Sequence, residues 1–304
     1  MSGYRRWLAG VLMAGLLLGG GALLLRGGIY GLTLFILLPI ILGGAGAWCV
    51  RAQTAGSAAS AGGFAVMMAS VAWLALGQEG VICIVMSLPL SSPLGCLGGW
   101  IFYRFQLGRL QPGSAAMLLL LPFGALGWDV NAKPPVFEVR SAIEIAAPVE
   151  RVWKNVVTFS ELPEPREWYF KAGLAYPKRA RIEGSGPGAV RYCEFSTGPF
   201  VEPIEVWNEP SLLRFRVTEN PAPMHEWSPY AQVLPKHLHG YLVSKQRQFR
   251  LIPLGPNRTL LEGTTWYQHG LWPAEYWRLW SDALIHRIHL RVLTHIKRLS
   301  EAES

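Results

Sequence analysis

The first 131 residues carry almost no charge, and this restricts the chain more than any other feature of its sequence. Within them, apolar runs follow one another with only short polar breaks. A run of about 20 apolar residues is long enough to cross a hydrocarbon core ~30 Å thick. We therefore expect residues 1–129 to form a helical transmembrane anchor. The charged residues of this stretch are Arg5, Arg6, Arg26, Arg51, Arg104, Arg109, Glu79 and Asp129.

The anchor contains five apolar runs. The first could be a signal peptide, but a second run begins after only three residues, which is typical of a helical hairpin in a membrane. The fifth run has 14 residues and is short for a full span. The sequence therefore allows four or five spans. The runs are Trp7–Leu25, Ile29–Val50, Gly62–Gly77, Val81–Phe105 and Ala115–Trp128.

Glu79 interrupts the apolar sequence and has two interpretations. If residues 62–105 are one continuous membrane region, its carboxyl lies at membrane depth, where an ionisable group indicates a function. If the region divides at Gly77–Gly80, Glu79 lies in a turn at the lipid headgroups. The two pieces are then near spanning length, so we favour the turn.

The arginines predict how the anchor is oriented. If the first four runs span, five arginines lie on one side and only Arg26 lies on the other, which places the N-terminus in the cytoplasm. Five spans then put the C-terminal half outside the cytoplasm, whereas four keep it inside. We expect a multi-pass protein of a bacterial inner membrane with an extracytoplasmic C-terminal domain. The five arginines are Arg5, Arg6, Arg51, Arg104 and Arg109.

The charge of the C-terminal half argues against nucleic acid as a partner. The net charge of the chain is +8, but the 22 Lys/Arg and 18 Asp/Glu residues after residue 132 are interleaved, with no arginine-rich run. A basic balance beside a membrane instead fits contact with anionic headgroups, so the bilayer is the expected partner. Cys193, the single cysteine of this half, has no partner for an internal disulfide.

Short strands dominate the sequence after a proline-containing linker, Val130–Pro135. Runs rich in β-branched and aromatic residues alternate with Gly, Pro, Asn and Ser, which predicts antiparallel neighbours joined by turns. A short helix opens near Pro148. The expected strands are Val136–Ile145, Ala189–Ser196, Phe200–Trp207, Leu212–Val217, Tyr241–Pro253 and Thr259–His269.

A long helix is predicted from Pro273 to Ser300. Its apolar residues recur at helical spacing and need a sheet to cover them. The proline-rich segment Asn220–Gly240 is unusually long for a plain connection, which is typical of a lid or binding loop. The expected inward stripe is Trp277, Trp280, Leu284, Ile288, Val292 (or Arg291), Ile296 and Leu299.

Residues Ile143–Trp153 match the pattern I-x-I-x-A-P-x-x-x-V-W, and Gly186-x-Gly188 and Trp207-x-Glu209-Pro210 each precede a strand. On these motifs, Val136–Ala302 resembles the START/Bet v 1-like superfamily, also called SRPBCC or polyketide cyclase/dehydrase-type. The resemblance implies an α+β helix-grip fold, in which an antiparallel sheet surrounds a long C-terminal helix. The long 220–240 segment departs from the simplest family pattern.

The resemblance also implies a hydrophobic cavity between sheet and helix, which members use for sterols, lipids, polyketides or hormones. The superfamily shares no catalytic residue, so none is carried over to this chain. Arg181 and Arg191 flank the glycine turn and either meet a ligand carboxylate or phosphate or, as we favour, pair with Glu183 or Glu194. The full set of cavity or lid candidates is Arg181, Arg191, Trp227, Tyr230, Trp266, Trp277, Trp280, Leu284 and Ile288.

Two histidine pairs have the spacing of metal ligands, His237-x-His239 and His286-x-x-His289. No acidic residue accompanies either pair by spacing, so we expect no metal site. The glycines at 184, 186 and 188 precede a strand and not a helix, unlike a nucleotide fingerprint. We therefore expect no cofactor.

These observations predict an anchor at 1–129, a linker at 130–135 and a helix-grip domain at 136–304. The expected function is membrane-tethered binding of a lipid or other apolar small molecule. One alternative is a cyclase or dehydratase-type enzyme, which needs a titratable group with a shifted pKa in the cavity. The other alternative is a structural protein whose cavity is closed by side chains.

Overall fold

The computed structural model describes residues 3–108, 112–230, 233 and 235–302. The chain divides into two compact units, a helical unit (1–133, 226–237 and 270–276) and a sheet unit (134–225, 238–269 and 277–304). The first division, after Lys133, falls within the expected linker. The sequence does not indicate that two short segments of the C-terminal half belong to the helical unit.

Apolar helices make up the helical unit. In its described part, three helical stretches are long and apolar enough to cross a membrane, namely Trp7–Gly27, Ala55–Ala75 and Val81–Gln106. Thr33–Cys49 is a shorter apolar helix, with a π-helical first turn at Thr33–Leu37. The elements are α1 (Gly3–Gly27), η1 (Thr33–Leu37), α2 (Leu38–Cys49), α3 (Ala55–Ala75), α4 (Val81–Gln106) and α5 (Pro112–Asn131).

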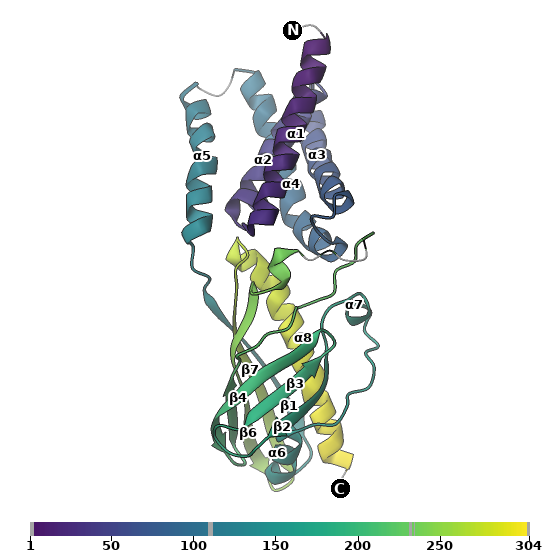
Figure 1. Ribbon diagram of the computed structural model, residues 1–304, viewed down its shortest axis with the longest axis vertical. Coiled ribbons are helices and arrows are strands. Elements are labelled where there is room, and N and C mark those ends of the chain that lie inside the picture. Colours follow the sequence, from purple (N-terminus) through teal and green to yellow (C-terminus); the bar gives the residue numbers. More distant parts are fainter. Residues whose placement is uncertain (1–2, 109–111, 231–232, 234, 303–304) are drawn as a thin grey trace. The chain divides into compact units, whose positions relative to one another are not determined.

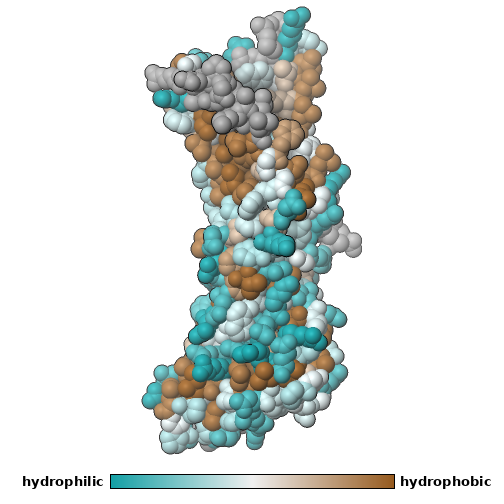
Figure 2. All heavy atoms as spheres, turned by 90° about the vertical axis from the view of Figure 1, so that its left-hand side faces the viewer, coloured by the Kyte–Doolittle hydropathy of each residue, from teal (hydrophilic) through white to brown (hydrophobic). Residues whose placement is uncertain are grey.

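Hydrophobic side chains cover much of the outer surface of these helices (Figure 2). Leu16, Phe64 and Phe123 are all exposed. A contiguous apolar surface of this kind marks a contact with lipid or with another apolar surface. Glu79 lies in the turn between α3 and α4, as the second interpretation requires, but its side chain is buried and not solvated.

Glycines allow α2, α3 and α4 to pack closely. A Cβ atom added to Gly43 of α2 or to Gly62 of α3 would overlap the carbonyl oxygen of Gly95 in α4. Small residues at such positions let helix backbones approach and gain van der Waals contact where lipid offers no hydrophobic driving force.

The sheet unit contains seven antiparallel strands in the order β1-β7-β6-β5-β4-β3-β2. The strands curve, and the long helix α8 (Ala274–Ala302) runs beside them (Figure 1). This arrangement confirms the predicted α+β helix-grip class, preceded by apolar helices. The strands are β1 (Val136–Ile145), β2 (Pro177–Glu183), β3 (Val190–Phe195), β4 (Gly198–Asn208), β5 (Leu212–Arg216), β6 (Leu242–Gly255) and β7 (Arg258–His269).

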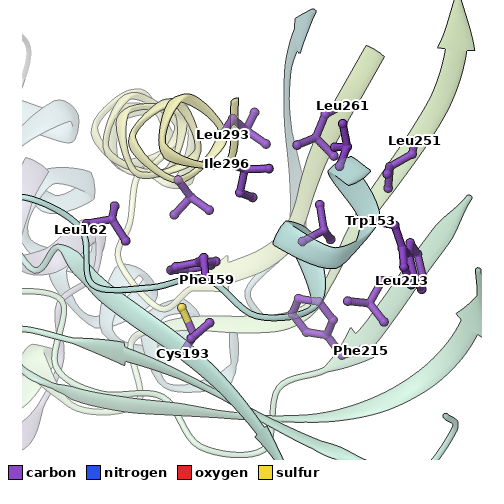
Figure 3. Packing of buried hydrophobic residues seen from close by; sticks show 14 of the residues in the cluster. Trp153, Phe159, Leu162, Cys193, Leu213, Phe215, Leu251, Leu261, Leu293 and Ile296 are labelled. Carbon is purple, nitrogen blue, oxygen red and sulfur yellow. The ribbon is translucent and has the colours of Figure 1, made fainter. Parts of the chain in front are cut away.

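The core lies between α8, the sheet and the short helix α6 (Val149–Val157), and Figure 3 shows its packing. Val152 and Val156 are four residues apart, so α6 presents both on one face. Leu293 and Ile296 of α8 belong to the same buried cluster. The remaining helices are α7 (Trp168–Lys171), which is a single turn, and the short 3-10 helix η2 (Lys236–Leu238).

The period-two alternation of β3 and β4 decides what faces this core. In β3, Arg191, Cys193 and Phe195 are buried, and in β4 the buried set includes Phe200, Glu202 and Ile204. Successive side chains of a strand point to opposite faces. One arginine and one glutamate are therefore directed inward with the apolar residues.

Candidate functional site

A cavity of about 60 Å³ lies between α8 and strands β3 to β7 of the sheet unit. Its wall is mostly apolar, but it includes two arginines, a glutamate and a histidine. The lining residues are Arg191, Cys193, Phe195, Glu202, Phe215, Arg247, Gln248, Phe249, Gly263, Thr264, Thr265, Ile285, Ile288, His289, Val292 and Leu293.

Arg191, Glu202 and Arg247 form a buried ionic network. Arg191 Nη1 donates to Glu202 Oε2, and Arg247 Nη1 donates to Glu202 Oε1 at 3.0 Å. The side chains of Arg191 and Glu202 are 2% and 0% exposed, and that of Arg247 is 17% exposed. One carboxylate thus faces two guanidinium groups, so the network carries an excess positive charge.

Arg191 is held by aromatic rings as well as by Glu202. Its Cζ lies 5.1 Å from the ring centroid of Phe215, 5.5 Å from that of Phe159 and 5.7 Å from that of Phe249. In the described part of the chain, Nε and Nη2 of Arg191 have no hydrogen-bond partner. Buried polar groups almost always have one. The Cys193 thiol interacts with this guanidinium, but a thiol sulfur is only a weak acceptor, so a stronger acceptor would be favourable here.

His289 contributes a neutral polar edge to the cavity. Its Nε2 lies 2.8 Å from Thr265 Oγ1, and its Nδ1 lies 3.0 Å from Ser141 Oγ. Burial lowers the pKa of His289 from 6.5 to about 3, with a smaller contribution from the charge of Arg247. The ring is therefore uncharged near neutral pH. His286 shares the same serine, with Nδ1 2.7 Å from Ser141 Oγ.

Cys193 brings a thiol to the cavity wall. Burial, followed by the charge of Glu202, raises the pKa of this thiol to about 11. The group is therefore a thiol and not a thiolate near neutral pH, and the thiolate is the nucleophilic form.

Two of the predicted site residues, Arg191 and Ile288, line the cavity. Trp280 is 37% exposed, Leu284 is half-buried and Trp277 is buried, and none of the three is among the lining residues. The lining positions of α8 are instead Ile285, Ile288, His289, Val292 and Leu293.

Arg181 and Trp266 lie away from the cavity lining. Arg181 is half-exposed, pairs with Glu183 and Glu194, and stacks over the ring of Tyr192, with its Cζ 3.9 Å from the centroid. Trp266 donates from Nε1 to Glu138 Oε2 at 2.9 Å. The pairing with Glu183 or Glu194 that was favoured from the sequence therefore holds for Arg181, whereas Arg191 pairs across the strands with Glu202.

Trp227 and Tyr230, the two lid candidates, belong to the helical unit. The carbonyl oxygen of Trp227 accepts a hydrogen bond from Val81 N at 2.8 Å. The Tyr230 hydroxyl donates to the carbonyl oxygen of Ala75. Both residues therefore pack at the turn between α3 and α4.

Glu202, Arg247 and His289 are site residues that the sequence analysis did not propose. Strand carboxylates usually point to solvent, but the side chain of Glu202 is fully buried. A signal was present, because Phe200-x-Glu202-x-Ile204 places the carboxylate on the apolar side of the alternation. His289 was considered with His286 only as a metal pair.

No protein-family model and no curated protein matches the chain. Several solved structures are similar to part of this chain, and three of them are described below. Norcoclaurine synthase from Thalictrum flavum, in complex with dopamine and hydroxybenzaldehyde, is 13% identical, with a TM-score of 0.38, and the match covers 56% of this chain and 90% of that one.

The second structure is the Zhui aromatase/cyclase from Streptomyces sp. R1128, at 16% identity and a TM-score of 0.36, over 56% of this chain and 96% of that one. The third is a START superfamily protein from Mycobacterium smegmatis, at 14% identity and a TM-score of 0.36, over 55% of this chain and 99% of that one.

Proposed function

We propose that the sheet unit binds a small molecule with an apolar body and an acidic end group. The observation that carries the proposal is Arg191, whose guanidinium lines the cavity with Nε and Nη2 unpaired among the described residues. The apolar helices of the same chain would hold this binding domain at a membrane.

The charge balance supports an acidic end group. Burying an unpaired charge is costly, and here two guanidinium groups share the single carboxylate of Glu202. A ligand carboxylate or phosphate beside Arg191 would neutralise the excess charge. It would also accept hydrogen bonds from the two unpaired groups, and such charge-assisted hydrogen bonds are the strong ones.

The apolar wall supports an apolar body. Phe195, Phe215, Phe249 and the aliphatic residues of α8 surround the space next to Arg191. Apolar surface buried there would contribute ~25 cal/mol per Å².

The size of the cavity restricts the ligand. A water needs roughly 10–15 Å³ of such space, so about 60 Å³ holds a few atoms of a ligand and not a whole lipid. A lipid or another long ligand would need α8 to move away from β7. We therefore propose that the acidic end binds first and that a longer apolar part displaces the helix.

Binding agrees better with the cavity than acid–base or thiol catalysis does. A general acid or base works best with a pKa near the working pH. The pKa of His289 is lowered to about 3 and that of Cys193 is raised to about 11, so both are shifted away from neutrality.

The membrane tether rests on length and composition. Three helical stretches are apolar and long enough to span, and we propose that the N-terminus is cytoplasmic and the sheet unit extracytoplasmic. A reporter active only in an oxidising compartment, fused after Ser304, should be active. A reporter active only in the cytoplasm at that position would place the domain on the other side.

The ligand class can be tested by calorimetric titration of the full chain in detergent. We expect octanoate to bind more tightly than octanol and Arg191→Met to abolish the difference. Arg181→Met, on the neighbouring strand but outside the cavity, is the control and should leave the preference intact. Equal affinities of the unaltered protein for octanoate and octanol would contradict an acidic end group.

The location of the binding site can be tested with two substitutions on α8. Ile288→Trp should fill the cavity and weaken octanoate binding at least tenfold. Leu284→Trp, one turn earlier and outside the lining, should bind normally. Native mass spectrometry of the unaltered protein should show a co-purified small molecule. Absence of both bound molecule and octanoate binding would favour a structural role with a closed cavity.

A further inference from the structure

Three ionisable side chains converge in the helical unit: two lie four residues apart, and the third is more than 150 residues further along the chain. They are Glu79 in the turn before α4, Cys83 in the first turn of α4, and His237 in segment 226–237. Cys83 Sγ lies 2.7 Å from His237 Nε2, and Glu79 Oε2 lies 3.6 Å from His237 Nδ1. One ligating atom from each residue lies within 4.8 Å of the other two.

The convergence is buried and its hydrogen bonding is incomplete. Glu79 and His237 are 7% and 8% exposed. Among the described residues, neither Glu79 Oε2 nor His237 Nδ1 has a hydrogen-bond partner. The carboxylate oxygen and the imidazole nitrogen face each other, and each lacks the hydrogen-bond partner that buried polar atoms almost always have. An ion bound to both atoms would satisfy them.

A second carboxylate approaches the same thiol. Glu226 Oε1 lies 2.5 Å from Cys83 Sγ, and the two oxygens of Glu226 accept hydrogen bonds from Ile82 N at 3.0 Å and Cys83 N at 3.1 Å. The Cys83 thiol thus lies beside both the imidazole of His237 and the carboxylate of Glu226, and Glu79 lies on the other side of the imidazole. Without a cation, this concentration of acidic groups in a buried place is unfavourable.

We propose that Glu79, Cys83 and His237 bind a divalent cation of the zinc class, with Glu226 as a positioning residue for Cys83. Sulfur, nitrogen and carboxylate oxygen are the donors that Zn²⁺ takes, whereas Mg²⁺ and Ca²⁺ take oxygen donors alone. Three protein ligands leave a fourth position for a water or another ligand.

The surroundings orient the ligands. The Tyr30 hydroxyl donates to Glu79 Oε1 at 2.7 Å, which leaves Oε2 directed at His237. Hydrogen bonds of this kind to ligating carboxylates and imidazoles are typical of metal sites. The ring of Tyr30 also packs edge-on against His237, with centroids 4.8 Å apart.

The cation would hold segment 226–237 to the turn between α3 and α4. That segment already contacts the turn through Trp227 O, which accepts from Val81 N, and through the Tyr230 hydroxyl, which donates to Ala75 O. A metal ion would add a bond from His237 to residues 79 and 83. The site therefore acts as a clamp inside the helical unit.

A different chemistry has the same residue order. A cysteine that contacts a histidine, which in turn contacts an acid, is also the arrangement of nucleophile, base and orienting group in a catalytic triad. The contact of Glu226 with Cys83 Sγ disfavours the thiolate that such a nucleophile needs, because a like charge lies beside it. A bound cation removes this conflict, and the metal site is therefore favoured.

Metal content tests the proposal directly. The full chain, purified in detergent with an affinity tag free of histidine, should contain about one zinc per chain by elemental mass spectrometry. Cys83→Ser, Glu79→Gln and His237→Gln should each lose at least nine-tenths of it. Three separate ligand variants keep the test informative if one of them does not fold, which size-exclusion chromatography will show.

Two matched controls are available. Cys49→Ser removes an exposed cysteine of α2, and His239→Gln removes an exposed histidine two residues from His237. Both variants should retain zinc. Replacing zinc by Co²⁺ should give a thiolate-to-cobalt absorption band in the unaltered protein and in both controls, but not in Cys83→Ser.

Thiol labelling distinguishes the two chemistries. If a cation holds Cys83, N-ethylmaleimide should modify it only after a chelator is added, with at least a tenfold increase in rate. The proposal is overturned if zinc is below a tenth of an equivalent and Co²⁺ gives no band. It is also overturned if Cys83 forms a thioester with p-nitrophenyl acetate at a rate that a chelator does not change, the result expected of a nucleophile.

Discussion

Arg191 of β3 and Glu202 of β4 face each other in register and form an ion pair that is almost completely buried. Arg247 of β6 reaches the other oxygen of the same carboxylate. The network of Arg191, Glu202 and Arg247 therefore links three strands on the inner face of the sheet. Because it borders the cavity, its energetics and the ligand preference should be connected.

Removing the carboxylate alone should destabilise the sheet unit strongly. Glu202→Gln leaves two guanidinium groups without a counter-charge, and breaking a buried pair costs about 3–5 kcal/mol. The double change Arg191→Met/Glu202→Leu should cost less than Glu202→Gln, because it removes charge and counter-charge together. Denaturant unfolding of the full chain in detergent, followed by tryptophan fluorescence, measures both.

The exposed pair Arg179–Glu194 provides the control. Glu194→Gln should change the free energy of unfolding by about 0–1 kcal/mol, as for other surface ion pairs. Equal decreases in the free energy of unfolding for Glu202→Gln and Glu194→Gln would contradict a buried ionic network around Glu202.

Much of the fold could be predicted because each strand is short and bounded by turn residues. The inner residues of α8 could be predicted only in part: Trp277, Val292 and Ile296 are buried as expected, whereas Ile285 and Leu293 were missed for a geometric reason. An α-helix turns about 100° per residue, so a stripe spaced by four residues drifts about 40° at each step. Trp280, Leu284, Ile288 and Ile296 therefore cannot share one face, and the buried side includes Ile285 and Leu293.

Residue types alone also could not predict which charged side chains are buried. An arginine on a strand is usually solvated, and only its alternation with Cys193 and Phe195 shows that Arg191 points inward. The cluster around Cys83 had little local signal, because only Glu79 lies near Cys83 in sequence and His237 is 154 positions away. Spacing rules for metal ligands apply within one element and miss such long-range sites.

Close helix packing in the helical unit should depend on Gly43. Gly43→Val places a side chain against the carbonyl oxygen of Gly95, and overpacking of this kind costs about 1–3 kcal/mol. Gly15→Val is the control, since a Cβ there meets no atom within 4 Å. Thermal unfolding in detergent should show a lower midpoint for the first variant alone. A drop of similar size in both would point to a general effect of valine in an apolar helix.

His289 should make stability depend on pH. Its pKa is about 3 in the folded protein and near 6.5 when unfolded, so below pH 6.5 the unfolded chain binds the proton more readily. The contribution of His289 to the free energy of unfolding is complete above pH 6.5 and is lost as the pH falls towards 3. His289→Gln should flatten the decline of the unfolding midpoint over this range. An unchanged slope would show that other groups dominate acid unfolding.

The sheet unit should retain its core without the apolar helices, but the described residues of two segments next to it in sequence should lose their order. A fragment beginning at Lys133 contains every strand and α8, with the buried cluster around Leu293 and Ile296 intact. Segments 226–237 and 270–276, however, belong to the helical unit. In the full chain, Trp272 N donates to Tyr30 O at 3.0 Å, and this bond is lost in the fragment.

We therefore expect the fragment to unfold cooperatively while amide exchange in residues 226–237 and 270–276 becomes much faster than in the full chain. Strands β6 and β7 serve as the internal control and should exchange at similar rates in both proteins. Hydrogen–deuterium exchange with mass spectrometry measures all of these segments in one experiment. Equal protection of 226–237 and 270–276 in the two proteins would mean that the sheet unit orders them by itself. Loss of protection in β6 and β7 would mean that the sheet depends on the helices.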